Sequence, residues 1–254
     1  MKLQNKTILI TGGSSGIGLE LARQLLKAGN TVLITGRDPN RLARAQAALS
    51  GVHIYQSDAS DPAQIRALCR EVSARFPKLD VLINNAGVMR NINLNQVSDP
   101  DALLSEITIG LNGPILMSQH FLSLLRNQPE ALIVNVSSGL AFIPFTIAPI
   151  YSAAKAGLHA YTKCLRTQLK KTSIKVVELM PPGTETPLFR GEFKKEMAGQ
   201  KGMPVADLVK QAIKGIEAGH TEIRPGLARV LGVMSRVAPD FMMAQMTKMS
   251  APKA

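Results

Sequence analysis

Short runs of apolar residues alternate with longer amphipathic stretches along most of the chain. Six apolar runs are predicted to be strands, at residues 7–11, 31–35, 52–56, 79–84, 131–137 and 174–180. They are almost continuously apolar, which is typical of parallel strands buried on both faces. Helical patterns lie between and after them, at residues 17–28, 39–49, 61–75, 99–125, 151–170 and 204–218. This alternation predicts an α/β fold with a parallel sheet flanked by helices.

Nothing in the pattern divides the chain into two domains. No repeat, low-complexity tract or Pro-, Gly- or Ser-rich linker interrupts it, so residues 1–254 are expected to form a single domain. The segment 181–204 is rich in glycine and proline and indicates a long loop. Loops of this length in compact domains are often active-site lids, so we expect a lid at about 183–204.

The tail, about 226–254, is basic and rich in methionine. Its apolar residues are Leu227, Val230, Leu231, Val233, Met234, Val237, Phe241, Met242 and Met246, with Arg229, Arg236 and Lys248 among them. A basic amphipathic helix can lie on an anionic membrane, but methionine-rich stripes are also typical of adaptable core and interface packing. We expect the tail to fold back beside a substrate pocket or onto a neighbouring subunit, without touching lipid.

Composition and charge exclude several other classes of protein. Cys69 and Cys164 are isolated from each other and from any histidine cluster, so neither a disulfide framework nor a metal site is expected. The net charge of +12 comes from scattered Lys and Arg mixed with acids, which favours solvated helix faces over nucleic-acid binding. The N-terminus does not resemble a signal peptide, and no run approaches the length of a membrane span. We therefore expect a soluble cytoplasmic protein.

A glycine-rich turn follows the first predicted strand and opens a helix. Gly12, Gly16 and Gly18 permit a tight turn, a close approach to a pyrophosphate and close helix–strand packing. The N-terminus of the helix adds unpaired N–H groups and the positive end of its dipole. Because the motif lies at the first strand–helix junction of an α/β chain, it predicts a dinucleotide site.

The end of the second strand bears on which dinucleotide is bound. NAD-binding proteins usually have an acid there, which binds the ribose 2′-OH, whereas this chain has Gly36 and Arg37. Arg37 is suited to bind a 2′-phosphate, and Arg41 lies one helical turn further on. Asp38 is expected to cap the helix that begins at Pro39. These residues favour NADP(H) over NAD(H).

Several motifs together resemble the short-chain dehydrogenase/reductase family over essentially the whole chain. They are TGGSSGIG (11–18), DAS (58–60), NNAG (84–87), NVSS (135–138), YSAAK (151–155) and PPGTETP (181–187), in the family's order and spacing. PPGTETP is similar to the branch named after a D-alanine-transfer operon, which does not define a substrate. The resemblance implies a Rossmann-like, doubly wound sheet of about seven strands, with TEIRPG (221–226) as a short seventh strand.

The resemblance also implies which residues bind the cofactor. They are Gly12, Ser14, Ser15, Gly16, Ile17, Gly18, Arg37, Asp58, Ala59, Asn85, Ala86, Gly87, Tyr151, Lys155, Pro182, Gly183, Thr184 and Thr186. Asp58 is assigned to the adenine, and Thr186 to the nicotinamide carboxamide. Asn84 is expected to tie neighbouring strands together.

Tyr151, Lys155 and Ser138 are the expected catalytic residues. Residues four apart share a helix face, so Lys155 lies beside Tyr151. The lysine ammonium, with the positive nicotinamide ring, is expected to lower the pKa of Tyr151 towards the range that a general acid–base catalyst needs. The resemblance implies that Ser138 polarises the substrate oxygen and that Lys155 also binds the nicotinamide ribose.

One position departs from the family pattern. In ITIGLNGP (107–114), Gly110 occupies the position where the family usually has an asparagine that relays protons through water to the lysine. Asn112 is two residues further on, about 200° around a regular helix, and would face away. Three possibilities stay open: a relay through water alone, a local distortion that brings Asn112 back, or impaired proton transfer.

Three functions compete. The first is an NADP(H)-dependent carbonyl reductase or alcohol dehydrogenase acting on a small molecule; the second is a catalytically impaired cofactor-binding or sensing protein, which Gly110 favours. Binding of nucleic acid is the third, and no motif supports it. Leu188, Phe189, Phe193 and Met197 in the lid indicate an apolar or mixed substrate pocket. The long helices at 99–125 and 151–170 favour a homodimer or homotetramer.

Overall fold

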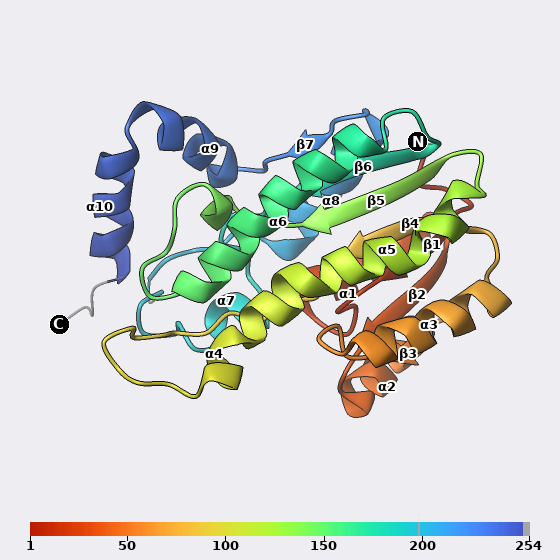
Figure 1. Cartoon of the computed structure of the whole chain (residues 1–254), viewed down its shortest axis with the longest axis horizontal. Helices are drawn as coiled ribbons and strands as arrows, with labels where there is room; N and C mark the ends of the chain where they lie inside the picture. Colours follow the sequence, from red (N-terminus) through yellow and green to blue (C-terminus); the bar gives the residue numbers. More distant parts are fainter. Residues whose placement is uncertain (198, 251–254) are drawn as a thin grey trace.

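The strands form one parallel sheet. The structure, a computed structural model, describes residues 1–197 and 199–250. Within these residues seven strands pair in the order β3-β2-β1-β4-β5-β6-β7, every pair parallel (Figure 1). They are β1 (Thr7–Ile10), β2 (Thr31–Gly36), β3 (His53–Gln56), β4 (Leu79–Asn84), β5 (Ala131–Val136), β6 (Ile174–Leu179) and β7 (Glu222–Ile223). The predicted sheet, including the short seventh strand, is confirmed.

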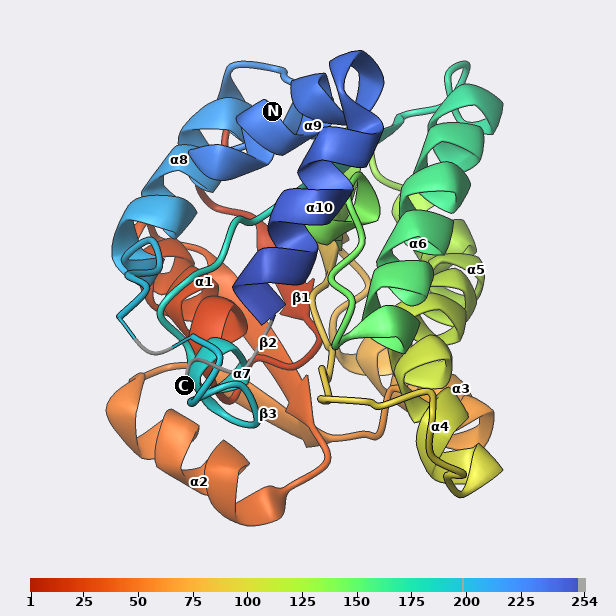
Figure 2. The same cartoon turned by 90° about the vertical axis from the view of Figure 1, so that its left-hand side faces the viewer.

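Two helical layers enclose the sheet (Figure 2). One face is covered by α1 (Gly16–Lys27), α2 (Pro39–Ala48) and α8 (Val205–Glu217), the other by α3 (Pro62–Arg75), α5 (Gly113–Arg126) and α6 (Pro149–Gln168). Within β1, Ile8 and Ile10 belong to the first core and Leu9 to the second, because successive strand side chains point to opposite faces. Both cores are continuous across the sheet, which makes the fold a single domain.

An Asp–Pro pair begins several helices. Asp38 accepts hydrogen bonds from the backbone N–H groups of Asn40 (2.9 Å) and Arg41 (3.1 Å) at the start of α2, which confirms its predicted capping role. Asp61 and Asp99 cap α3 and α4 (Pro100–Ile107) in the same way. The cap satisfies free N–H groups, and proline suits the first helical turn.

The helix predicted at 99–125 is not continuous. It is divided into α4, a π-helical turn at Thr108–Asn112 and α5. Pro114 explains the break, because it has no N–H to donate to the carbonyl of Gly110 and its ring would crowd that carbonyl in a regular α-helix. A wider turn relieves the conflict, as is common for such insertions.

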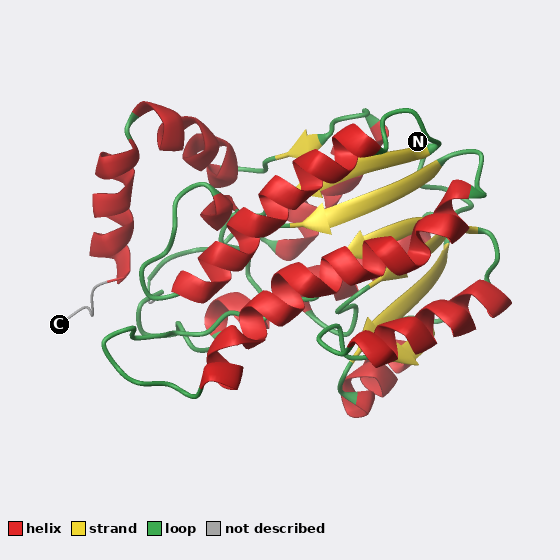
Figure 3. Cartoon of the chain, in the orientation of Figure 1, coloured by secondary structure: helices red, strands yellow, loops and turns green. Residues whose placement is uncertain are grey.

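The carboxyl ends of the strands meet on one side of the molecule. The long loops gather there (Figure 3), together with α7 (Pro187–Arg190), α9 (Leu227–Val237) and α10 (Pro239–Ser250). Figure 2 views this side and shows α10 lying across it. The chain passes from β3 at one edge back to β4 beside β1, which creates the crevice where such sheets bind ligands. In the described ranges, no helix has the length and apolarity to span a bilayer.

Candidate active site

A cavity of about 650 Å³ lies at the carboxyl ends of the strands. Its walls come from the β1–α1 turn, the ends of β2 to β5, α6, the segment 181–201 and the C-terminal helices. Of the predicted site residues, these line it: Gly12, Ser14, Ser15, Gly16, Ile17, Arg37, Asp58, Ala59, Asn85, Ala86, Gly87, Ser138, Tyr151, Lys155, Pro182, Gly183, Thr184 and Thr186. Gly18 lies behind this wall. The structure thus brings residues from the whole length of the chain into one site.

The glycine turn leaves no room for side chains. Gly12 has φ +65°, and a Cβ there would lie 2.9 Å from the Cα of Ala86. A Cβ on Gly18 would lie 2.4 Å from the carbonyl oxygen of Gly12, so Gly18 lets α1 pack against the turn. Because α1 begins at Gly16, the unpaired N–H groups of Gly16 and Ile17 belong to residues of the cavity wall. This is the arrangement that binds a phosphate group.

The end of β2 contributes two guanidinium groups and one carboxylate. Arg37, which is exposed, Asp38 and Arg41 all line the cavity. The Asp38 carboxylate caps α2 and lies 3.3 Å from the Nε of Arg41. That carboxylate is therefore already partnered within α2, and Arg37 adds a further positive charge beside it.

Polar side chains tie the strand ends to the turn. The amide of Asn84 donates to Asn135 across β4 and β5 (2.8 Å), as expected for a structural residue. The amide of Asn85 donates to the carbonyl oxygens of Thr11 (3.0 Å) and Gly12 (3.2 Å). The hydroxyl of Thr186 caps α7 by accepting from the N–H of Phe189 at 3.3 Å. These bonds hold the cavity walls at fixed positions.

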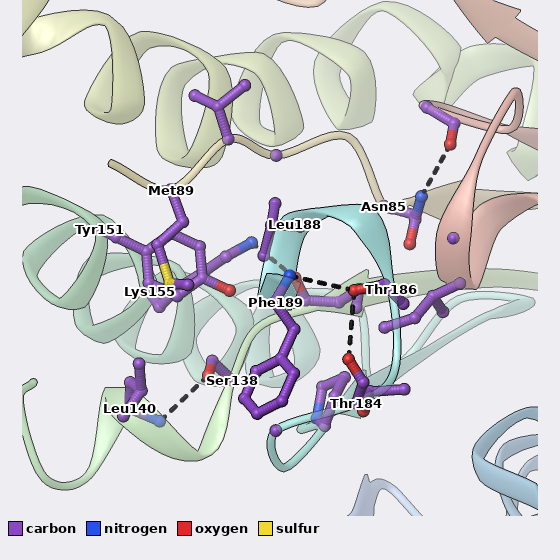
Figure 4. A pocket seen from close by; sticks show the side chains of 18 of the residues that line it. Asn85, Met89, Ser138, Leu140, Tyr151, Lys155, Thr184, Thr186, Leu188 and Phe189 are labelled. Carbon is purple, nitrogen blue, oxygen red and sulfur yellow. Dashed lines mark hydrogen bonds between the residues drawn. The ribbon is translucent and has the colours of Figure 1, made fainter. Parts of the chain in front are cut away.

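Ser138, Tyr151 and Lys155 lie together on one wall (Figure 4). Ser138 follows β5, and its hydroxyl accepts a hydrogen bond from the N–H of Leu140 at 3.1 Å. Lys155 lies one turn after Tyr151 on α6, with its Nζ 5.5 Å from the centre of the tyrosine ring. The Nζ also donates to the carbonyl oxygen of Val136 at 2.9 Å, which anchors the lysine to the end of β5.

Burial dominates the acid–base properties of this group. It raises the pKa of Tyr151 to about 12, although a hydrogen bond with Ser138 opposes the shift. Burial also lowers the pKa of Lys155 to about 8. In the protein without cofactor the pKa of Tyr151 is therefore raised, and the expected lowering by Lys155 together with the nicotinamide ring stays a prediction. Removing the hydroxyl from water disfavours the phenolate more than its neighbours stabilise it.

Glu106 is a nearby carboxyl group that sequence reasoning missed. It is 1% exposed, and its Oε1 accepts a hydrogen bond from the N–H of Arg90 at 2.8 Å. Burial raises the pKa of Glu106, and its negative charge contributes to the raised pKa of Tyr151. The only sequence signal was an acid inside a largely apolar helical pattern.

The π-turn does not bring Asn112 to the cavity. Asn112 is exposed, while Gly110 is buried against α6, where a Cβ would lie 3.4 Å from the Cβ of Ala154. The local distortion exists, but it does not restore an amide at the position of Gly110. Any proton relay therefore depends on water or on other side chains.

The remaining wall of the cavity is mostly apolar. Leu188, Phe189 and Met197 contribute to it, as predicted from the segment 183–204. Phe193 does not, because it is fully buried and packs against Phe145 with 6.1 Å between the ring centres. The tail folds back beside the pocket, which is one of the two expected arrangements, and Leu227, Val230, Leu231, Met242 and Met246 line it.

Comparison with known proteins identifies the relatives of this chain. Residues 6–197 match the family model of the short chain dehydrogenases. The chain is 39% identical over 242 residues to the uncharacterized oxidoreductase DltE of Bacillus subtilis, covering 95% of each chain.

Two solved structures share the fold and contain different cofactors. One is a short chain dehydrogenase from Burkholderia cenocepacia in complex with NADP (22% identity, TM-score 0.83, covering 97% of this chain and 99% of that one). The other is a short chain dehydrogenase/reductase from Burkholderia phymatum in complex with NAD (21% identity, TM-score 0.84, covering 100% and 98%). The choice between NADP and NAD therefore rests on this chain's own residues.

Proposed function

Since this chain belongs to the short-chain dehydrogenase family, we propose that it is an NADP(H)-dependent oxidoreductase acting on a carbonyl compound or the corresponding secondary alcohol. The observation that carries this proposal is the shared cavity, where the glycine turn meets Ser138, Tyr151 and Lys155. The turn fits a dinucleotide because Gly12 and Gly18 allow its backbone to pack tightly, while Gly16 and Ile17 at the start of α1 line the cavity where a pyrophosphate would lie. The bound nicotinamide supplies or accepts the hydride.

Side chains of the protein donate the proton and stabilise the charges that form. In the reductive direction Tyr151 donates its hydroxyl proton to the carbonyl oxygen, and burial keeps that hydroxyl protonated beforehand. Ser138 donates a hydrogen bond to the same oxygen as negative charge develops on it. The ammonium of Lys155 stabilises the phenolate that remains. The apolar wall excludes water, which strengthens each of these interactions.

The charges at the end of β2 support the preference for NADP(H). Arg37 and Arg41 line the cavity there, and the carboxylate of Asp38 is engaged as the cap of α2. A 2′-phosphate would add two negative charges beside these guanidinium groups, which bind phosphate by charge-assisted hydrogen bonds.

A substrate screen with NADPH and NADH in parallel tests the function. We expect turnover of aldehydes or ketones, and we expect Tyr151→Phe to reduce kcat about 10²- to 10⁴-fold while cofactor affinity changes little. Tyr161→Phe is the matched control, because Tyr161 lies on the same helix but does not line the cavity. Full activity of Tyr151→Phe would exclude the proposed role. Cofactor binding without turnover of any compound would favour the alternative, a cofactor-binding or sensing protein, to which Gly110 points.

A further inference from the structure

The end of the cavity beyond Tyr151 has an apolar wall rich in methionine. Its side chains include Met89, Leu140, Phe145, Leu231, Met242 and Met246. The acidic residues of the cavity wall, Asp38 and Asp58, belong to the opposite end, near β2 and β3. The polar residues on the lid and tail side are Thr184, Thr186, Gln200, Lys201 and Gln245, and none of them is acidic. Methionine is flexible and unbranched, so a wall of this kind adapts to a flexible alkyl chain.

This apolar wall continues out of the cavity onto the surface. Leu227 and Val230 on α9 and Met249 on α10 line the cavity, yet they are 70%, 51% and 41% exposed. Cofactor and substrate share a cavity of about 650 Å³, a volume typical of a single ligand site. A substrate longer than a few carbons must therefore pass across this rim.

We infer that the substrate carries a flexible apolar chain, which runs from Tyr151 along α10 and leaves across Leu227 and Val230. This inference rests on the proposed function and names the class of its substrate. The carbonyl lies at Tyr151 and Ser138, where the hydride arrives and the hydroxyl forms. Each buried CH₂ contributes about 0.8 kcal/mol, which corresponds to about fourfold in kcat/KM.

A homologous series of aldehydes from butanal to dodecanal tests the inference. We expect kcat/KM with NADPH to rise about fourfold per CH₂ until the chain passes the rim. The double variant Leu227→Gln, Val230→Gln should lower kcat/KM about tenfold more for dodecanal than for butanal. Val237→Gln is the matched control, because Val237 lies on the same helix, is 73% exposed and does not line the cavity.

A binding measurement separates this inference from the proposed function. A fluorescent long-chain alcohol should bind to the cofactor-free protein, more weakly to the double variant and unchanged to Val237→Gln. The inference would be overturned if kcat/KM did not change along the aldehyde series, or if the rim variant and the control variant had equal effects. If neither an aldehyde nor a ketone is turned over but the probe binds as expected, the oxidoreductase function fails and the apolar-chain site stands.

A second, independent observation is a buried ion cluster under α6. Tyr151, Lys155 and His159 are spaced four residues apart and share one helix face. Glu178 on β6 is fully buried beneath this face: its Oε1 accepts from the hydroxyl of Ser137 at 2.6 Å, and its Oε2 lies 2.9 Å from Nδ1 of His159. The negative charge of Glu178 raises the pKa of Lys155, although burial lowers the same pKa by a larger amount.

The other charged groups around the cluster lie on its far side. Glu222 on β7 is paired with Arg166 (3.6 Å) and with Arg224, and its charge contributes to the raised pKa of Glu178. The hydrogen bonds from Ser137 and His159 act in the opposite direction and favour the ionised carboxylate. Lys155 is bonded to the carbonyl oxygen of Val136 and Glu178 to the hydroxyl of the next residue, Ser137, so both are anchored at the end of β5. This geometry points to Glu178 as a positioning residue that keeps the buried Lys155 in its ammonium form.

The protonation of Lys155 can be measured directly in the cofactor-free protein. Competitive acetylation as a function of pH, with long reaction times and read by mass spectrometry, gives its midpoint, since Lys155 is only 3% exposed but lines the cavity. Glu178→Gln should lower that midpoint by about one unit, so that about fivefold more Lys155 reacts at pH 7. The alkaline limb of the kcat/KM profile should shift in the same direction. Glu222→Gln, the control, should change the midpoint much less.

A second variant keeps the test decisive if Glu178→Gln fails to fold. His159→Gln removes one hydrogen-bond partner of the carboxylate and changes a side chain that is 17% exposed, so we expect a smaller shift in the same direction. An unchanged Lys155 midpoint in a folded variant would overturn the role assigned to Glu178.

Discussion

Reduction and oxidation should depend on pH in opposite ways, because Tyr151 must be neutral for one and ionised for the other. The cavity raises the pKa of Tyr151 from 10.0 to about 12. At about 1.36 kcal/mol per unit, this shift favours the neutral phenol by about 3 kcal/mol. The protein by itself is therefore prepared to donate a proton rather than to accept one.

The expected profiles follow from this bias. The rate of reduction should stay nearly constant from about pH 6 to pH 8, since Tyr151 remains protonated throughout, and it should fall above about pH 8 as Lys155 loses its charge. The rate of alcohol oxidation should rise about tenfold per pH unit over the same range. That rise should end at the pKa that Tyr151 has in the complex with cofactor. Each unit by which the bound cofactor lowers this pKa requires about 1.36 kcal/mol of interaction free energy.

Two assays check this prediction. Initial rates in both directions, with one alcohol–ketone pair, give the pH profiles. Tyrosinate absorbance provides an independent check, because the chain has 3 tyrosines and burial raises the pKa of each of them. When oxidised cofactor is added, the absorbance should show one ionised tyrosine below pH 10, and Tyr151→Phe should abolish this signal. Oxidation that is already independent of pH at neutrality, or a cofactor-free Tyr151 that ionises below its ordinary pKa, would refute the reasoning.

Four further predictions concern other parts of the molecule. Arg37→Ala should lower kcat/KM for NADPH about tenfold and leave kcat/KM for NADH unchanged. The effect should be no larger than this, because Arg37 is exposed and solvent screens its expected contact with the 2′-phosphate. Equal use of both cofactors by the parent protein would contradict the prediction. Gly110→Asn should raise kcat if proton relay is limiting, while Gly110→Ala should not. Leu116 and Leu122 on α5 are only partly buried, so light scattering should show a homodimer or homotetramer at micromolar concentration, and a monomer would exclude both. Deleting residues 226–254 should lower the unfolding temperature and leave binding to anionic liposomes unchanged, and a loss of co-sedimentation would instead indicate a membrane role.

Local patterns determined much of this protein. The six long apolar runs are the six long strands, and the Asp–Pro pairs that include Asp38 begin helices where capping chemistry places them. The glycine turn and the four-residue spacing of Tyr151 and Lys155 brought the main site groups together at the expected end of the sheet. These features depend on residues close in sequence, so a sequence pattern suffices to predict them.

Tertiary packing decided the rest. The pKa of Tyr151, the proximity of Glu178 to Lys155 and the burial of Phe193 in the core all depend on elements that are distant along the chain. The tail lies beside the pocket because α9 and α10 pack against residues that are distant along the chain, such as Phe145 and Tyr151. Desolvation and Coulomb interaction depend on the three-dimensional surroundings of a charge, so they emerge only when the chain has packed.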